Sequence, residues 1–95
     1  MDNEAILTQL QKCKNIGPTC TQHLYKAGIY DIETMQKLGA EEVFFQMWKA
    51  NPMIAIHPCY IYALEGAITD VPLGSVPQNR REDFKQFCKD LKASL

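Results

Sequence analysis

Several features that often reveal a protein's chemistry are absent from this sequence. No apolar run is long enough to span a membrane, and the N-terminal residues Asp2 and Glu4 are acidic where a secretory signal would be basic. The four cysteines form no Cys-x-x-Cys pair, and no glycine-rich phosphate loop or nucleophile elbow is present. No alternating strand pattern or low-complexity segment occurs either. We therefore expect a cytoplasmic, all-α protein with reduced thiols, which is neither a membrane protein nor an enzyme.

The length and the charge narrow the class further. Ninety-five residues predict one domain, covering residues 1–95. A net charge of −1 argues against a strong nucleic-acid binder. The charge is uneven, however, because residues 12–26 carry three lysines and no acid, whereas residues 31–49 carry four acids and two lysines. We expect a locally basic N-terminal region on a mildly acidic body.

Apolar residues recur at helical spacing along the chain, and helix signals mark most segment ends. Asp2 or Asn3 is expected to cap the first helix, and Asn79 with Glu82 to form a capping box at the last. Gly66 lies inside the fifth helix, which suggests a close helix crossing with no room for a side chain. The expected helices are one carrying Ile6, Leu7, Leu10 and Cys13, then 18–27, a short one with Ile32, Met35 and Leu38 inward, one from Ala40 to before Asn51, then 58–69, and one from about Asn79.

The segment from Cys13 to Pro18 predicts a tight turn between the first two helices. Asn15 and Gly17 both tolerate the left-handed backbone region, and Pro18 suits the first position of the next helix because its missing N–H needs no partner there. A turn that opens onto a helix N-terminus gathers free amides at the positive end of the helix dipole, which favours an anion such as phosphate. The same corner also serves packing or protein docking, and both interpretations stay open.

Longer motifs point to known families. Ile16 and Gly17 are placed as the apolar pivot and second glycine of a helix-hairpin-helix motif, Asn15 stands at the usual first glycine, and residues 27–29 (Ala-Gly-Ile) close the second helix. Two further runs, 30–40 and 62–68, accompany this motif, and the second contains Ala-Leu-Glu-Gly-Ala. Together these segments make the chain from about residue 6 to 91 resemble the C-terminal domain of the TfoX family of bacterial competence regulators.

The resemblance implies a compact five- or six-helix single domain with a helix-hairpin-helix (SAM-like) core at about 4–29. It implies a non-enzymatic regulatory module, acting in competence- or transcription-linked regulation through a protein partner or weak, sequence-independent DNA contact. Longer members carry an N-terminal domain, which we expect to be absent here or supplied in trans. The alternative is a bare DNA-backbone clamp of repair or replication type. The candidate phosphate-binding residues are Lys12, Lys14, Asn15, Ile16, Gly17, Pro18, Thr19 and Lys26.

Aromatic residues suggest a second surface. Phe44 and Phe45 cannot both face one core, and neither can Tyr60 and Tyr62, so at least some of Phe45, Trp48 and Tyr62 are expected at its edge. A partly exposed aromatic patch of these three residues would favour a protein partner or a homodimer.

Catalytic and metal sites have little support in the sequence. Glu41 and Glu42 are adjacent on a helix and splay apart, and the pairs Cys20 with His23 and His57 with Cys59 match no known zinc spacing. An enzyme using Cys20 or Cys59 as nucleophile is a distant third alternative. We expect no cofactor, no metal and no small-molecule substrate.

Overall fold

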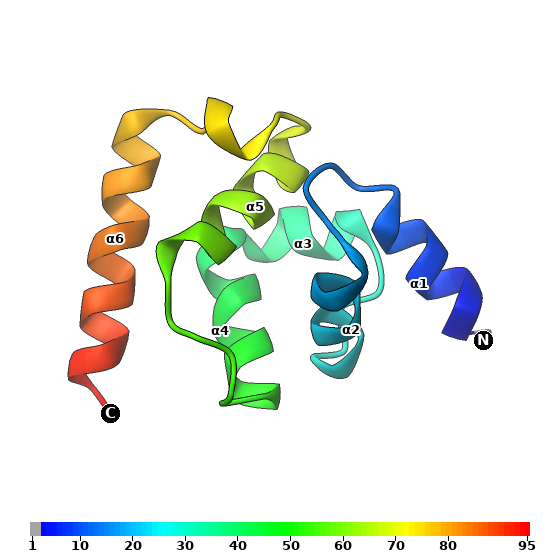
Figure 1. Cartoon of the computed structure of the whole chain (residues 1–95), viewed down its shortest axis with the longest axis horizontal. Coiled ribbons are helices and arrows are strands. Elements are labelled where there is room, and N and C mark those ends of the chain that lie inside the picture. Colours follow the sequence, from blue (N-terminus) through cyan, green and yellow to red (C-terminus); the bar gives the residue numbers. More distant parts are fainter. Residues whose placement is uncertain (1–2) are drawn as a thin grey trace.

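Six α-helices and one short 3-10 turn make up the part of the chain that the computed structural model describes, residues 3–95 without the side chains of Asn3 and Leu73. No strand occurs in that part, so the predicted all-α class is confirmed. The helices α1 and α6 lie at opposite ends of the molecule (Figure 1). The elements are α1 (Asn3–Gln11), α2 (Pro18–Lys26), α3 (Ile32–Leu38), α4 (Ala40–Ala50), α5 (Pro58–Thr69), η1 (Leu73–Ser75) and α6 (Gln78–Ala93).

The helix α4 lies at the centre of the core and packs against α2, α3 and α5. Its residues Val43, Phe44 and Met47 are fully buried, as their spacing predicted. Burying an apolar side chain of this size contributes about 1.5–3 kcal/mol relative to leaving it exposed, so this face is a main source of stability. None of the helices in residues 3–95 is both long and apolar enough to cross a bilayer.

The helix ends follow the local chemistry in most places. Asp31 caps α3 by accepting a hydrogen bond from the N–H of Thr34 at 2.7 Å, and Gly28 ends the α2 region with a φ of 81°. Pro58 begins α5, where His57 Nδ1 accepts a hydrogen bond from the N–H of Cys59 at 3.1 Å. The predicted cap of α1 lies outside what the structure describes, since Asp2 and the side chain of Asn3 are not among the described parts.

The expectation that Leu38 faces inward is wrong, because this side chain is 40% exposed. Residues three apart on a helix rotate about 60° per step, so the positions of Ile32, Met35 and Leu38 drift across the helix surface. Met35, in the middle, is fully buried, and Ile32 is half-buried. A two-turn helix therefore buries only the central member of such a series.

The membership of Tyr62 in a partly exposed aromatic patch is also wrong, since this residue is only 8% exposed. α5 is covered on two sides, by α4 and by α6. The ring of Tyr60 lies 6.2 Å from that of Phe44 on α4, whereas the ring of Tyr62 lies 6.0 Å from that of Phe84 on α6. The two tyrosines pack against different helices, so burial of one does not require exposure of the other.

The helix α6 starts one residue earlier than predicted, at Gln78, and the expected capping box of Asn79 and Glu82 does not form. Pro77 occupies the cap position and offers no side-chain hydrogen bond, and Glu82 instead accepts from Gln78 Nε2 at 2.6 Å. Arg81 reaches back and donates to the carbonyl of Val76 at 2.9 Å, which holds the connector before α6 in place.

One arginine joins three helices. Arg80 of α6 pairs with Glu65 of α5 at 2.9 Å, with Glu41 of α4 at 3.1 Å and with Asp83 at 3.1 Å. Its guanidinium also lies 4.7 Å from the ring centre of Phe84. The hydrogen bond to Glu65 is the main reason why the pKa of Arg80 is raised. The side chain thus fixes the position of α6 relative to α4 and α5.

Candidate functional site

The predicted turn between the first two helices is present, and residues 12–17 are called the hairpin turn below. Asn15 adopts the left-handed conformation with a φ of 68°. Gly17 does not, because its φ of −94° and ψ of −179° are extended. Ile16, between them, is 5% exposed and belongs to the core. The bend therefore depends on Asn15 and on the anchoring of Ile16, and Gly17 is not needed for its backbone angles.

The start of α2 leaves backbone donors available. Within residues 3–95, the N–H groups of Gly17, Thr19 and Cys20 have no hydrogen-bond partner. Gly17 and Thr19 are exposed, and no side chain caps the helix. The carbonyl of Gly17 is already occupied, since the N–H and the hydroxyl of the buried Thr21 both donate to it. The arrangement offers donors to an anion at the positive end of a helix.

The predicted lysines do not all gather at this turn. Lys12 and Lys14 lie in the hairpin turn and are exposed. Lys26 is also exposed, but it is the last residue of α2, which begins at Pro18. Eight residue steps of helix separate these ends by about 12 Å. Lys26 therefore belongs to the same basic region without flanking the free amides.

The hairpin turn contacts α5 through a side chain that the sequence did not reveal as a partner. Asn15 Nδ2 donates to the carbonyl of Val71 at 2.9 Å. The close approach predicted at Gly66 is real, but the neighbour is this amide and not a crossing helix: a Cβ at position 66 would overlap Asn15 Nδ2 and lie 2.6 Å from Val71 O. A glycine inside a helix and an asparagine at a usual glycine position were the two available signals. The sequence does not show that they meet.

Of the predicted aromatic surface, two members stay together. Phe45 and Trp48 of α4 are both half-buried, with ring centres 6.2 Å apart, and Lys49 Nζ lies 5.8 Å from the Phe45 ring centre. Tyr62 does not join them, because α6 covers it.

Three of the four thiols are poor candidates for nucleophiles at neutral pH, because burial favours their protonated form. Burial raises the pKa of Cys20 to about 11 and also raises the pKa of Cys13 and Cys88. Cys59 is exposed. Among residues 3–95, no three His, Cys, Asp or Glu side chains gather closely enough to hold a metal ion.

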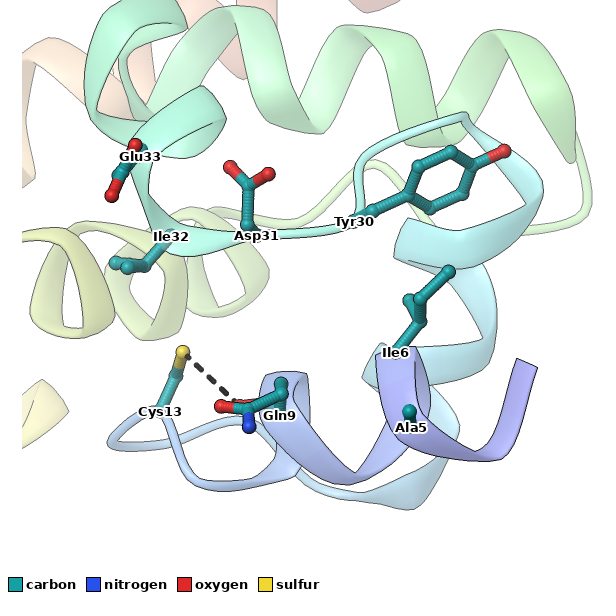
Figure 2. Close-up of a pocket in the computed structure, with 8 residues that line it drawn as sticks. All are labelled: Ala5, Ile6, Gln9, Cys13, Tyr30, Asp31, Ile32 and Glu33. Carbon is teal, nitrogen blue, oxygen red and sulfur yellow. Dashed lines mark hydrogen bonds between the residues drawn. The ribbon is translucent and has the colours of Figure 1, made fainter. Parts of the chain in front are cut away.

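A groove of about 430 Å³ lies between α1 and the segment that leads into α3. In Figure 2, Ile6 extends from α1 towards the segment that leads into α3, whereas the carboxylate of Asp31 points away from α1. No local sequence pattern indicates this groove, because its two walls, residues 5–13 and 30–33, are at least 17 positions apart along the chain.

Comparison with known proteins agrees with this architecture. An uncharacterised protein from Listeria monocytogenes, solved in a triclinic crystal form, is 28% identical with a TM-score of 0.80, covering 87% of this chain and 92% of that one. A tetragonal crystal structure of a protein of unknown function from the same organism gives 28% identity and a TM-score of 0.79, covering 86% and 99%. No curated protein matches the chain. The model of the TfoX C-terminal domain family matches residues 6–88, and the chain therefore belongs to that family.

Proposed function

We propose that this chain is a non-enzymatic binding module of competence- or transcription-linked regulation, whose hairpin turn makes weak, sequence-independent contact with the DNA backbone. One observation carries the proposal: the N–H groups of Gly17, Thr19 and Cys20 have no partner among the described residues, beside the exposed Lys14. Backbone amides at a helix N-terminus bind phosphate without reading bases, so the contact would be independent of sequence.

Charge supports a weak contact. Lys12 and Lys14 lie in the hairpin turn, and no acidic residue occurs between positions 12 and 26. The net charge of −1 still opposes approach to a polyanion. Two or three phosphate contacts correspond to a log–log salt slope of about −2 to −3 and to a Kd of roughly 10⁻⁴ to 10⁻⁶ M.

The proposal is tested by fluorescence anisotropy of a labelled duplex at two salt concentrations. Gly17→Val should weaken binding by about tenfold or more, because a hydrogen bond to a charged group contributes about 1.5–3 kcal/mol and the side chain would separate amides from phosphate. Gly74→Val is the matched control, since neither glycine has a positive φ or an atom within 4 Å of an added Cβ. Lys14→Gln should flatten the salt slope by about one, and Lys92→Gln on α6 should not.

The wild-type titration also decides the proposal by itself. If it shows no binding to duplex at low salt, the DNA contact is wrong. If Gly17→Val and Gly74→Val bind equally well, the free amides are not the contact site.

A second candidate function is docking of a regulatory protein or of a second copy of the chain. The half-buried, neighbouring rings of Phe45 and Trp48 favour it, because aromatic residues are enriched in interfaces. The test is sedimentation velocity over a range of concentrations together with Trp48 fluorescence. Concentration-dependent dimers whose fluorescence shifts would support docking of a second copy, and Phe45→Ser should weaken them.

A further inference from the structure

The hairpin turn is fastened to the C-terminal end of α5 by three residues, which we call the Asn15 latch: Asn15, Gly66 and Val71. The carbonyl of Val71 accepts from Asn15 Nδ2 at 2.9 Å, while the N–H of Val71 donates to the carbonyl of Gly66 at 2.8 Å. Gly66 leaves the space that the Asn15 amide fills. Asp70, in left-handed conformation with a φ of 58°, directs the chain back at this helix end.

The chemistry of position 15 explains the choice of asparagine. The φ of 68° suits glycine best, and asparagine and aspartate are among the few other residues that tolerate it. Glycine would supply the angle but no hydrogen bond. Aspartate would supply the angle but place an acceptor against the Val71 carbonyl. Asparagine alone of these three adopts the angle and also donates.

The latch lies directly before the free amides. Asn15 is two residues before Gly17, and Ile16 between them is buried in the core. The hydrogen bond from Asn15 to Val71 and the buried side chain of Ile16 therefore both hold the chain immediately before the N–H groups of Gly17, Thr19 and Cys20.

We propose that Asn15 is the positioning residue of the hairpin turn, and that its latch to α5 holds the amides of Gly17, Thr19 and Cys20 in the geometry that binds phosphate. This inference rests on the proposed function. It assigns Asn15 a role through other residues, because its side-chain amide donates to the carbonyl of Val71.

The latch also links the turn to the connector that leads to α6. A ligand that binds the ordered turn more tightly than the loosened one must strengthen the latch by the same factor, since coupling between sites is reciprocal. Phosphate bound at the turn should therefore slow hydrogen exchange of the Asn15 side-chain amide.

The experiment compares Asn15→Gly, which keeps the backbone angle and the net charge, with the wild type. We expect duplex affinity to fall by about threefold to tenfold with the salt slope unchanged, because the neutral hydrogen bond to Val71 is lost and no phosphate-contacting lysine is removed. Gly66→Ala displaces the same amide while leaving Asn15 in place and should give the same loss. Asn15→Asp should bind more weakly still, whereas the surface control Asn79→Asp makes the same charge change on α6.

A spectroscopic readout separates this inference from the proposed function. In ¹⁵N-resolved NMR spectra without ligand, Asn15→Gly should shift and broaden the amide signals of Gly17, Thr19 and Cys20 while the α4 signals stay in place. Unchanged turn signals in a folded Asn15→Gly protein would overturn the positioning role, whether or not DNA binds. If the turn signals move as expected but the wild type binds neither duplex nor inorganic phosphate, the phosphate-binding role of the latch and the proposed function both fail. Should Asn15→Gly not fold, the Gly66→Ala spectra decide the positioning role by the same criterion.

Discussion

Gly66→Ala has two opposing effects on the free energy of unfolding, and the structure allows us to compare their magnitudes. Replacing glycine by alanine inside a helix normally stabilises it by about 1 kcal/mol. Here the new Cβ would overlap Asn15 Nδ2 and lie 2.6 Å from the carbonyl oxygen of Val71, where real Cβ atoms essentially never lie. Breaking the hydrogen bond between Asn15 and Val71 costs about 1 kcal/mol, and displacing packed groups costs about 1–3 kcal/mol more. The loss exceeds the gain, so we expect a net destabilisation of about 1–3 kcal/mol.

The assay is urea and thermal unfolding followed by circular dichroism. For a domain of this size, 1 kcal/mol corresponds to about 4–8 °C in Tm. Gly74→Ala is the control, since nothing lies within 4 Å of a Cβ at that position. In an Asn15→Gly background the amide is no longer in the way, so Gly66→Ala should cost at least about 0.5 kcal/mol less than in the wild type. A Gly66→Ala protein more stable than the wild type would refute the reasoning, because helix propensity would then outweigh the overlap.

Three further predictions concern other parts of the fold. Arg80→Met removes the partner of Glu65, whose side chain is only 13% exposed, and should lower the free energy of unfolding by about 1–3 kcal/mol in urea, with partial recovery when Glu65→Gln is added. Asp31→Ala should cost about 0.5–1 kcal/mol near neutral pH through the lost cap. The Thr34 N–H lowers the pKa of Asp31, so this stabilisation is present above the unfolded pKa of about 4 and is lost as the pH falls through the lower folded pKa. The difference in Tm between Asp31→Ala and the wild type should therefore shrink towards pH ~2. Burial raises the pKa of Cys20 from 9.0 to about 11, so the thiol of the unfolded chain ionises first, and the free energy of unfolding falls as the pH rises from 9.0 to about 11. Cys20→Ala should therefore lose less stability than the wild type between about pH 8 and pH 10.5. An equal loss of stability in the two proteins would contradict the raised pKa.

Most of the fold could be predicted because its signals are local. The bounds of α5, the buried face of α4 at Val43 and Phe44, and the cap at Asp31 each follow from residues within one or two helical turns. The burial of Tyr62 has the opposite character. This ring is covered by Phe84 and Arg81 of α6, which lie about twenty residues further along the chain. No local pattern encodes that contact.

The candidate site divides in the same way. The turn, the proline at the start of α2 and the exposed Lys14 were readable, because a tight corner needs particular residues at particular positions. The contact between Asn15 and Val71 was not, since it joins residues 56 positions apart. The sequence showed each half as an oddity, an asparagine at a glycine position and Gly66 inside a helix, but the partner of each is known only from the folded chain.

The open surroundings of Gly17 have a consequence for mutational scanning. Its extended backbone angles are available to every amino acid except proline, whose ring fixes φ at about −65°. No atom would obstruct an added Cβ. A library screened only for soluble, protease-resistant protein should therefore accept nearly any residue at position 17, while strongly rejecting substitutions at Gly66. Enrichment of glycine at position 17 should then appear only in a screen for ligand retention. Comparing the two screens at this position therefore separates the requirements of binding from those of folding.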